Sequence, residues 1–160
     1  MFSHGVTSHP PLGDYDITRG RTYLYLTNAP LYAFGHGLSY TAFEYGPLQV
    51  DPPAVGTGGV VNVTVAVRNV GPRDGDEVVQ LYVRAVEPRV PRPLQQLRGF
   101  RRVRIARGTA ATVTLPIAAA DLATWDEAAG GWRSEPGAYE ARVGASSADI
   151  RQTGRFRVER

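Results

Sequence analysis

The sequence predicts an all-β fold in which two sheets pack face to face. Short stretches of β-branched and aromatic residues alternate with polar residues at a period of two, which is the pattern of half-buried strands. Turn-forming residues separate these stretches, and the chain contains 18 glycines and 12 prolines. No stretch has the periodicity of a long helix. Together these observations are typical of an immunoglobulin-like β-sandwich.

The composition indicates one globular domain. The chain has 160 residues, of which 42% are hydrophobic and 21% are charged, so it does not resemble a disordered protein. The absence of cysteine excludes disulfides, thiol catalysis and the usual structural zinc sites. No apolar stretch is long enough to span a membrane, and no signal-peptide pattern opens the sequence. We therefore expect no membrane partner and leave the compartment open.

The charge pattern does not favour nucleic acid as a partner. The formal net charge is only +3, and all 18 basic residues are arginine. The densest basic run lies at residues 98–107, where Phe100 is the only aromatic residue. We interpret this run as a solvated strand face whose arginine stems cover apolar surface.

Seven strands are expected after an irregular beginning. Residues 60–70 show the clearest alternation, with valine at every second position. The turn sequence at residues 69–75 and the three prolines within residues 85–93 mark exposed connections. The expected strands are residues 43–50 (interrupted by Pro47), 60–70, 77–83, 97–105, 109–117, 137–144 and 153–159, with a helical turn within residues 118–125 and a polar turn at residues 126–131.

The phase of these strands predicts the core. In residues 97–105, Phe100 is out of phase with Leu97 and Val103, so a bulge near residues 99–102 is expected to reconcile them. The residues expected to be buried are Val63, Val65, Leu81, Val113, Leu115 and Val143.

The segment that precedes the sandwich has a different character. We divide the chain into a largely irregular connecting segment and strap, residues 1–45, and the sandwich, residues 46–160. The strap proper is residues 30–45, PLYAFGHGLSYTAFEY, which is too apolar for a free loop. We expect Leu31, Phe34, Leu38, Tyr40 and Phe43 to fold back on the sandwich. Residues before Pro30 are expected to be mobile, with protease cleavage at Arg19 or Arg21. The strap residues that we assign to an interdomain contact are Leu31, Tyr32, Phe34, Gly35, His36, Gly37, Leu38 and Tyr40.

Two tryptophans flank the polar turn. Exposed Trp125 and Trp132 would offer rings for stacking on sugars, which would make the chain a carbohydrate-binding module. The alternative is that the two tryptophans close a hairpin over the edge of the core. No catalytic, cofactor-binding or metal-binding set is assigned.

Several motifs, in order, resemble one known domain. Three motifs are similar to parts of the C-terminal fibronectin type III-like domain of family 3 glycoside hydrolases. They are the strap, NVGPRDGDEVVQLYV at residues 69–83 and PLQQLRGFRRVRIARGTAATVTLPI at residues 93–117. The resemblance extends over residues 14–158 through three further motifs, DYDITRGRTYLYL, DLATWD and EPGAYEARVGASSADI.

The resemblance implies a non-catalytic accessory module of a β-glucosidase or β-xylosidase. The family's catalytic aspartate and glutamate lie on two preceding domains, and none of the 15 acidic residues here matches their motifs. It also implies that the chain is a fragment without those domains, inactive alone, whose parent enzymes are often periplasmic or secreted. The partners are then the catalytic domains, in the same chain or in trans. A stand-alone carbohydrate-binding module and a module docking in trans on a two-domain hydrolase remain as alternatives.

Overall fold

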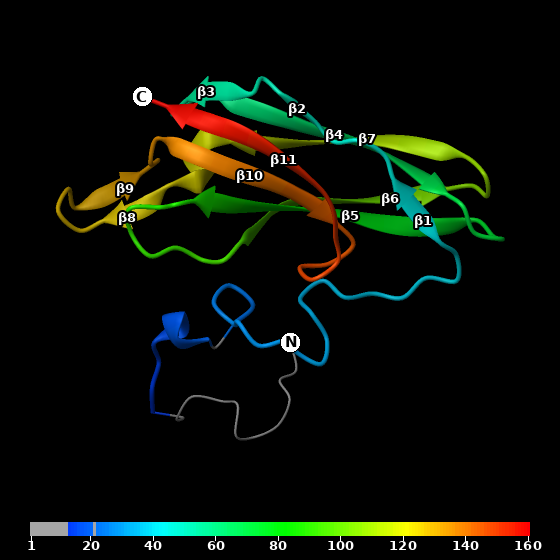
Figure 1. The fold of residues 1–160 in the computed structure, drawn as a ribbon, viewed down its shortest axis with the longest axis horizontal. Coiled ribbons are helices and arrows are strands. Elements are labelled where there is room, and N and C mark those ends of the chain that lie inside the picture. The colour runs from blue at the N-terminus through cyan, green and yellow to red at the C-terminus, as the bar shows by residue number, and fades with distance from the viewer. Residues whose placement is uncertain (1–12, 21) are drawn as a thin grey trace.

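The computed structural model describes residues 13–20 and 22–160 and contains two β-sheets packed face to face (Figure 1). The sandwich begins at β1 and ends at β11, close to the C-terminal residue. Its strands are β1 (Phe43–Tyr45), β2 (Gln49–Asp51), β3 (Ala54–Gly56), β4 (Val60–Asn69), β5 (Gly75–Val86), β6 (Gln96–Ile105), β7 (Ala110–Ala118), β8 (Thr124–Asp126), β9 (Gly131–Arg133), β10 (Gly137–Gly144) and β11 (Ile150–Glu159), with short 3-10 helices η2 (Ile17–Arg19) and η3 (Ala119–Leu122).

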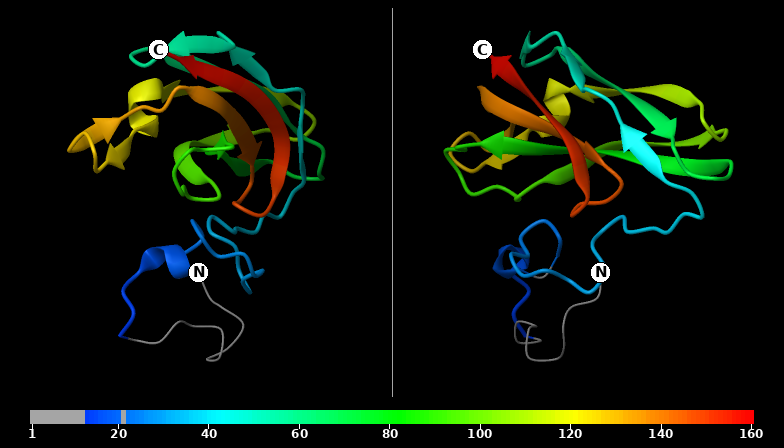
Figure 2. Two further views of the ribbon diagram at one scale, coloured as in Figure 1. Left: turned by 60° about the vertical axis from the view of Figure 1, so that its left-hand side comes forward. Right: turned by 45° about the vertical axis from the view of Figure 1, so that its right-hand side comes forward.

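The two sheets are built around β4 and β10. In the four-stranded sheet, β4 pairs antiparallel with β7 and with both β1 and β2. The five-stranded sheet has the order β3-β11-β10-β5-β6, in which only the short β3–β11 pair is parallel. The views in Figure 2 show that the sheets are curved, and one hydrophobic core lies between them. The predicted β-sandwich is therefore confirmed.

Alternating strands supply the core from both sheets. Along β4, Val61, Val63, Val65 and Val67 are buried while the residues between them face outward. The facing sheet contributes Val79, Leu81 and Val83 from β5, and Tyr139 stacks on Phe156 between β10 and β11. All six residues predicted to be buried are buried, which confirms the phases of β4, β5, β7 and β10. They are Val63, Val65, Leu81, Val113, Leu115 and Val143.

Three short strands were not predicted. β3 pairs with the end of β11, and β8 pairs with β9 to form a separate hairpin in which Trp125 faces Trp132. Each has only three residues, which is too short for a period-two pattern to be recognised. Residues 43–50 divide at Pro47 as expected, into β1 and β2. The helical turn is η3.

The bulge in β6 lies at Arg98, just before the predicted position, and has a different consequence. Leu81 pairs with Gly99, whereas the next residue, Tyr82, pairs with Leu97. Arg98 is therefore the extra residue, and the bulge reverses the phase of Leu97 instead of that of Phe100. The expectation that a bulge would bring these side chains into one core phase is wrong, because Leu97 and Phe100 both lie on the outer face of the sheet.

Candidate interdomain surface

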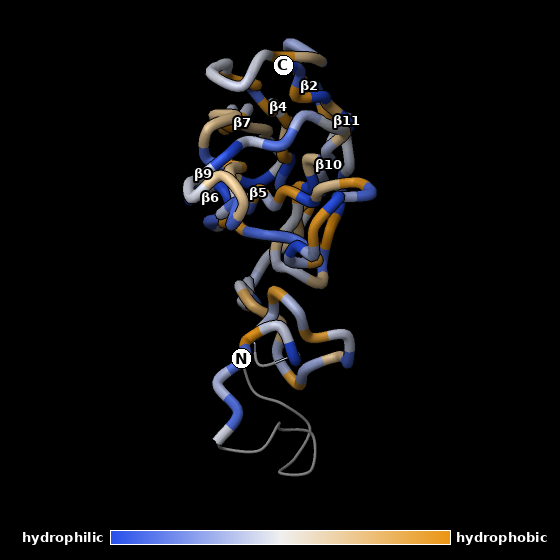
Figure 3. Tube along the Cα trace, turned by 90° about the vertical axis from the view of Figure 1, so that its left-hand side faces the viewer, coloured by the Kyte–Doolittle hydropathy of each residue, from blue (hydrophilic) through white to orange (hydrophobic). Residues whose placement is uncertain are grey.

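The strap runs across the outer face of the five-stranded sheet, outside the sandwich core (Figure 3). It is fixed to this face near Phe34 and Gly35, and to the turn between β4 and β5 near Thr41. A third attachment, at Tyr23, holds the segment that precedes it. Apolar side chains between these attachments point away from the sheet.

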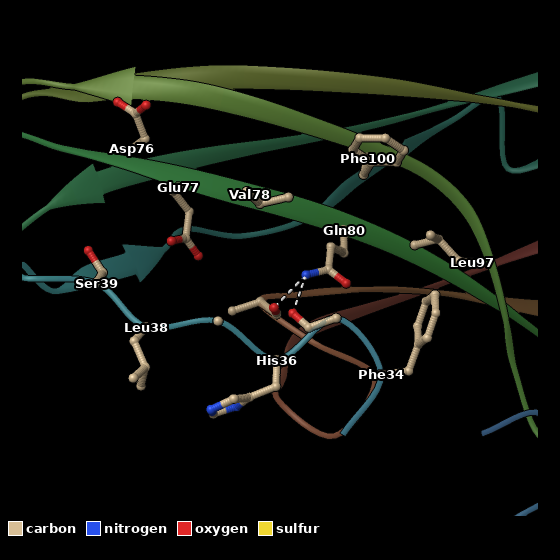
Figure 4. Close-up of a pocket in the computed structure, with 13 residues that line it drawn as sticks. Phe34, His36, Leu38, Ser39, Asp76, Glu77, Val78, Gln80, Leu97 and Phe100 are labelled. Atoms are coloured by element: carbon tan, nitrogen blue, oxygen red, sulfur yellow. Dashed lines mark hydrogen bonds between the residues drawn. The ribbon is translucent and has the colours of Figure 1, made fainter. Parts of the chain in front are cut away.

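The central attachment is made by a buried glutamine. Gln80 lies on β5, and its side-chain amide donates hydrogen bonds to the carbonyl oxygens of Gly35 (3.0 Å) and Ala145 (2.5 Å). Figure 4 shows the Gln80 amide pointing at these two backbone groups. The Tyr82 hydroxyl donates to Gln80 Oε1 (2.6 Å), and the Ser147 amide donates to the Phe34 carbonyl (2.9 Å). The turn at Gly35 therefore covers the Gln80 amide and supplies one of its hydrogen-bond acceptors.

A tyrosine anchors the segment before the strap. The ring of Tyr23 stacks on Phe34 with a centroid distance of 4.1 Å and meets the edge of Tyr82. Its hydroxyl accepts a hydrogen bond from the Leu97 amide (3.1 Å), and the Leu94 amide donates to the Leu24 carbonyl (2.7 Å). These contacts contradict, at Tyr23 and Leu24, the expectation that residues before Pro30 are mobile. Arg21, one of the two predicted cleavage positions, lies outside the described residues.

The end of the strap is fixed to the turn between β4 and β5. Asn69 is fully buried and donates to the carbonyls of Arg73 (2.7 Å) and Ile105 (2.9 Å), which closes this turn on itself. Its Oδ1 accepts a hydrogen bond from the Thr41 hydroxyl (2.7 Å). The turn glycine Gly71 lies so close to Thr41 that a Cβ atom would overlap its side chain. The turn predicted at residues 69–75 is thus also the docking point of the strap.

Between these attachments, apolar side chains of the strap remain in solvent. Leu38 is 94% exposed and Tyr40 is 92% exposed, and Leu31 and Tyr32 are at least half exposed. Figure 4 shows Leu38 and His36 directed away from β5. The expectation that the strap's apolar residues all fold back is confirmed for Phe34 and Phe43, which pack on the sandwich. It is wrong for Leu31, Leu38 and Tyr40, because the strap is held through its backbone while these side chains project outward.

The sheet adds apolar residues of its own to this face. Phe100 on β6 is 65% exposed, and Val78 on β5 is also exposed. Together with Leu38 and Leu97 they line a cavity of about 390 Å³ between the strap and the sheet. We use the term docking face for the exposed apolar residues Leu31, Tyr32, Leu38, Tyr40, Val78 and Phe100.

Sequence reasoning missed the part that β5 plays in this face. Residues 77–83, EVVQLYV, carry apolar or aromatic residues in both phases, with Val78 and Tyr82 on the side opposite Val79 and Leu81. Such a run is a signal for a strand covered on both faces. Gln80 and Tyr82 are buried although they face away from the core, because the strap and Tyr23 cover them.

The acidic groups beside this face have structural partners. The carboxylate of Glu77 accepts a hydrogen bond from the Tyr45 hydroxyl (2.7 Å), and burial raises the pKa values of both groups. Asp76 pairs with Arg102 across β5 and β6, and Asp74 lies 3.7 Å from Arg104. Arg102 and Arg104 thus form ion pairs while their side chains remain mostly in solvent, which agrees with the interpretation of the arginine run as a solvated face.

No cluster of three or more metal-binding side chains occurs within residues 13–20 and 22–160. In the same part of the chain, no helix is long and apolar enough to cross a membrane.

Trp125 and Trp132 lie on the β8–β9 hairpin, on another part of the molecule from the strap (Figure 1). Their rings meet edge to face at 6.0 Å, and they are 53% and 71% exposed.

Comparison with known proteins identifies the domain. A model of the fibronectin type III-like domain matches residues 77–147. A β-glucosidase from Rhizobium radiobacter is 46% identical over 122 residues, which cover 76% of this chain and 15% of that protein. A xylan 1,4-β-xylosidase from Xylanibacter ruminicola is 41% identical over 140 residues, covering 88% of this chain and 16% of that protein.

A solved structure agrees with these matches. The family 3 β-glucosidase of Bifidobacterium adolescentis superposes with a TM-score of 0.77 and 34% identity, over 85% of this chain and 20% of that one. The chain thus spans only about one sixth of the length of the two curated relatives. Fold, motif order and sequence identity together show that the chain belongs to the C-terminal fibronectin type III-like domains of the family 3 glycoside hydrolases.

Proposed function

We propose that this chain is a non-catalytic accessory module that docks on the catalytic domains of a family 3 glycoside hydrolase of the β-glucosidase or β-xylosidase type. The observation that carries the proposal is the docking face. Its apolar side chains are exposed, yet the backbone that bears Leu38 and Tyr40 is fixed on both sides by buried polar groups. Exposed apolar side chains that gather on one face are typical of a protein interaction site.

Rigid presentation favours binding. The attachments at Gln80 and Asn69 involve side chains that are buried and hydrogen-bonded on several atoms. A face that is already ordered loses less conformational entropy when a partner covers it. The aromatic and leucine side chains supply the apolar core of such an interface, while the ion pairs of Asp76 with Arg102 and of Asp74 with Arg104 supply a polar rim.

The proposed domain division follows from the same contacts. Residues before the sandwich, including the strap, form the connection to the catalytic domains, and the sandwich from about residue 46 forms the support. The catalytic domains lie either in the same polypeptide or in a separate one. In both arrangements the reacting carboxylates belong to the partner, and we expect the chain alone not to hydrolyse aryl β-glucosides or β-xylosides.

The test is complementation in trans. A family 3 β-glucosidase lacking its own fibronectin type III-like domain is co-expressed with the full chain, and soluble complex and hydrolysis of an aryl β-glucoside are measured. The chain is expected to co-purify with the partner and to raise its soluble yield or activity. Leu38→Glu is expected to abolish both effects, because it places a charge within the docking face.

The matched control is Val60→Glu, which introduces the same charge at an exposed valine on the four-stranded sheet. This variant is expected to behave like the parent chain. Complementation that survives Leu38→Glu, or no complex with any of several family 3 partners, would contradict the proposal. Circular dichroism of both variants distinguishes loss of binding from loss of folding.

A further inference from the structure

We propose that the β8–β9 hairpin and the loop between β5 and β6 form a binding groove for a neutral oligosaccharide, with Trp125 as the stacking surface. This site is distinct from the docking face and independent of it. The groove has a volume of about 910 Å³, which lies in the upper range for small-molecule sites in proteins. Thr57, Arg89, Val90, Trp125, Glu135 and Arg160 are among the residues that line it.

Trp125 gives the groove an aromatic surface that the core does not use. Trp125 lines the groove, and its cross-strand neighbour Trp132 packs against it edge to face at 6.0 Å. More than half of each side chain remains in solvent, so neither closes the sandwich core. The edge-to-face contact restricts the orientation of the Trp125 ring. An exposed indole held in this way can accept the flat, C–H-rich face of a sugar ring.

Buried polar contacts fix the walls of the groove relative to one another. The guanidinium of Arg92, whose side chain is 7% exposed, donates to the Leu122 carbonyl (3.0 Å), the Thr124 hydroxyl (3.0 Å) and Glu135 (3.0 Å). The Arg89 amide donates to the other oxygen of Glu135 (3.0 Å). One arginine therefore ties the start of β8 to the segment after β9 and to the loop that faces them. A groove built in this way is ordered before any ligand binds.

The charges of the lining residues indicate a neutral, hydroxyl-rich ligand. Three arginines (Arg89, Arg133 and Arg160) face the groove together with three acidic residues (Asp126, Glu127 and Glu135). Arg89 lies 3.4 Å from Glu135, and Arg133 lies 4.0 Å from Asp126, so these charges largely compensate each other. An anionic polymer would meet as many carboxylates as guanidinium groups. Paired hydroxyls of a sugar, in contrast, can donate to carboxylates and accept from guanidinium groups at the same time.

The test uses the tryptophans as reporters. The chain contains only two tryptophans, and both lie in this hairpin, so its tryptophan fluorescence reports on the groove. The full chain is titrated with cellotetraose and with xylotetraose, and with glycerol as a non-stacking control. A saturable change with a dissociation constant on the order of 1 mM or tighter is expected for at least one tetrasaccharide.

Variants then locate the site. Trp125→Ala is expected to weaken binding by at least about tenfold, or roughly 1.4 kcal/mol, while Trp125→Phe retains part of it. Phe100→Ala removes an exposed aromatic residue on the docking face and is expected to bind like the parent. Isothermal calorimetry repeats these measurements without relying on fluorescence, and circular dichroism confirms that each variant is folded.

Two kinds of result would overturn the proposal. The first is the absence of saturable binding of either tetrasaccharide up to about 50 mM, or equal binding by the parent and Trp125→Ala. The second is protection of residues 124–133 from hydrogen exchange by a two-domain family 3 hydrolase, with no effect of the saccharides, which would make the hairpin a protein contact. The first result leaves the docking face unaffected, and after the second result the exchange of residues 31–40 in the same complex tests the docking face separately.

Discussion

The side-chain amide of Gln80 fills the space in which a Cβ atom on Gly35 would lie. Gly35 also has a positive φ of 78°, a conformation that residues with side chains rarely adopt. The close approach allows Gln80 to hold the Gly35 carbonyl and the Ala145 carbonyl together. Two segments 110 residues apart in the sequence therefore meet at one buried amide, and the strap acquires a fixed position.

Replacement of Gly35 is expected to release this part of the strap. Gly35→Ala introduces both an unfavourable φ and an overlap with Gln80, and should destabilise the native state by about 2 kcal/mol or more. Chemical denaturation measures the loss, and hydrogen exchange at residues 30–42 measures local release. Gly37→Ala is the matched control, because a Cβ there meets no atom within 4 Å. Equal effects of the two substitutions would show that Gln80 does not fix the strap.

Two tyrosines on the N-terminal side are expected to differ in protease sensitivity. Tyr15 is 86% exposed, whereas Tyr23 is held between Phe34 and Tyr82. Limited chymotrypsin digestion should therefore cleave after Tyr15 well before Tyr23, leaving a folded product that retains the strap. In Tyr23→Ala, loss of the stacking contact should accelerate cleavage at Tyr25. Rapid cleavage at Tyr23 in the parent chain would show that this attachment does not persist in solution.

The loss of stability caused by core truncations should depend on which side chains of β4 and β5 are buried. Leu81→Ala is expected to destabilise by about 2–4 kcal/mol and Val65→Ala by somewhat less, because both side chains are buried between the sheets. Val78→Ala, on the exposed side of β5, should have a much smaller effect. Urea denaturation compares the three variants. If Val78→Ala lowered the free energy of unfolding strongly and Leu81→Ala lowered it little, the side chains of β5 would face the opposite way from the structure described here.

The Arg92–Glu135 ion pair should make stability depend on acid pH. Burial alone would raise the pKa of Glu135, but hydrogen bonds from Arg89 and Arg92 and their charges outweigh it and lower this pKa below its ordinary value. Because the folded-state pKa is the lower one, the pair stabilises the protein above the ordinary glutamate pKa, and this contribution is lost as the pH falls through the depressed value. Arg92→Ala should lower the free energy of unfolding by about 3 kcal/mol at pH 7.

The control for this pair is Glu135→Gln, which removes the titrating group but retains oxygen and nitrogen atoms for hydrogen bonding. Its stability should fall less than that of the parent between pH 6 and pH 3. Thermal unfolding across this range compares the two proteins. Parallel pH profiles for both would mean that the acid sensitivity comes from other carboxylates.

The sandwich was predictable because the residue pattern that specifies each long strand lies within that strand. The alternating valines of β4 determine which side chains are buried whatever surrounds them, and the same holds for β7 and β10. The strap was predictable only as an apolar segment. Which of its side chains are buried depends on Gln80 and Asn69, and these are distant in sequence from the residues they hold.

The outer face of β5 and β6 shows the same limit. The single extra residue at Arg98 determines that Leu97 and Phe100 share the outer face, and a phase argument cannot place a bulge to within one residue. The attachment of Tyr23 was missed because an isolated aromatic residue in an irregular segment carries no periodic signal. Three-residue strands such as β8 and β9 are invisible for the same reason.

The central claim, that the strap presents a protein-binding face, is tested most directly by hydrogen–deuterium exchange. The full chain is measured alone and with a family 3 β-glucosidase that lacks its own fibronectin type III-like domain. We expect slower exchange in peptides covering residues 31–40 and 97–102 in the complex, with unchanged exchange in β4 and β7. Unchanged exchange at residues 31–40 in a demonstrated complex, or protection confined to the four-stranded sheet, would contradict the claim.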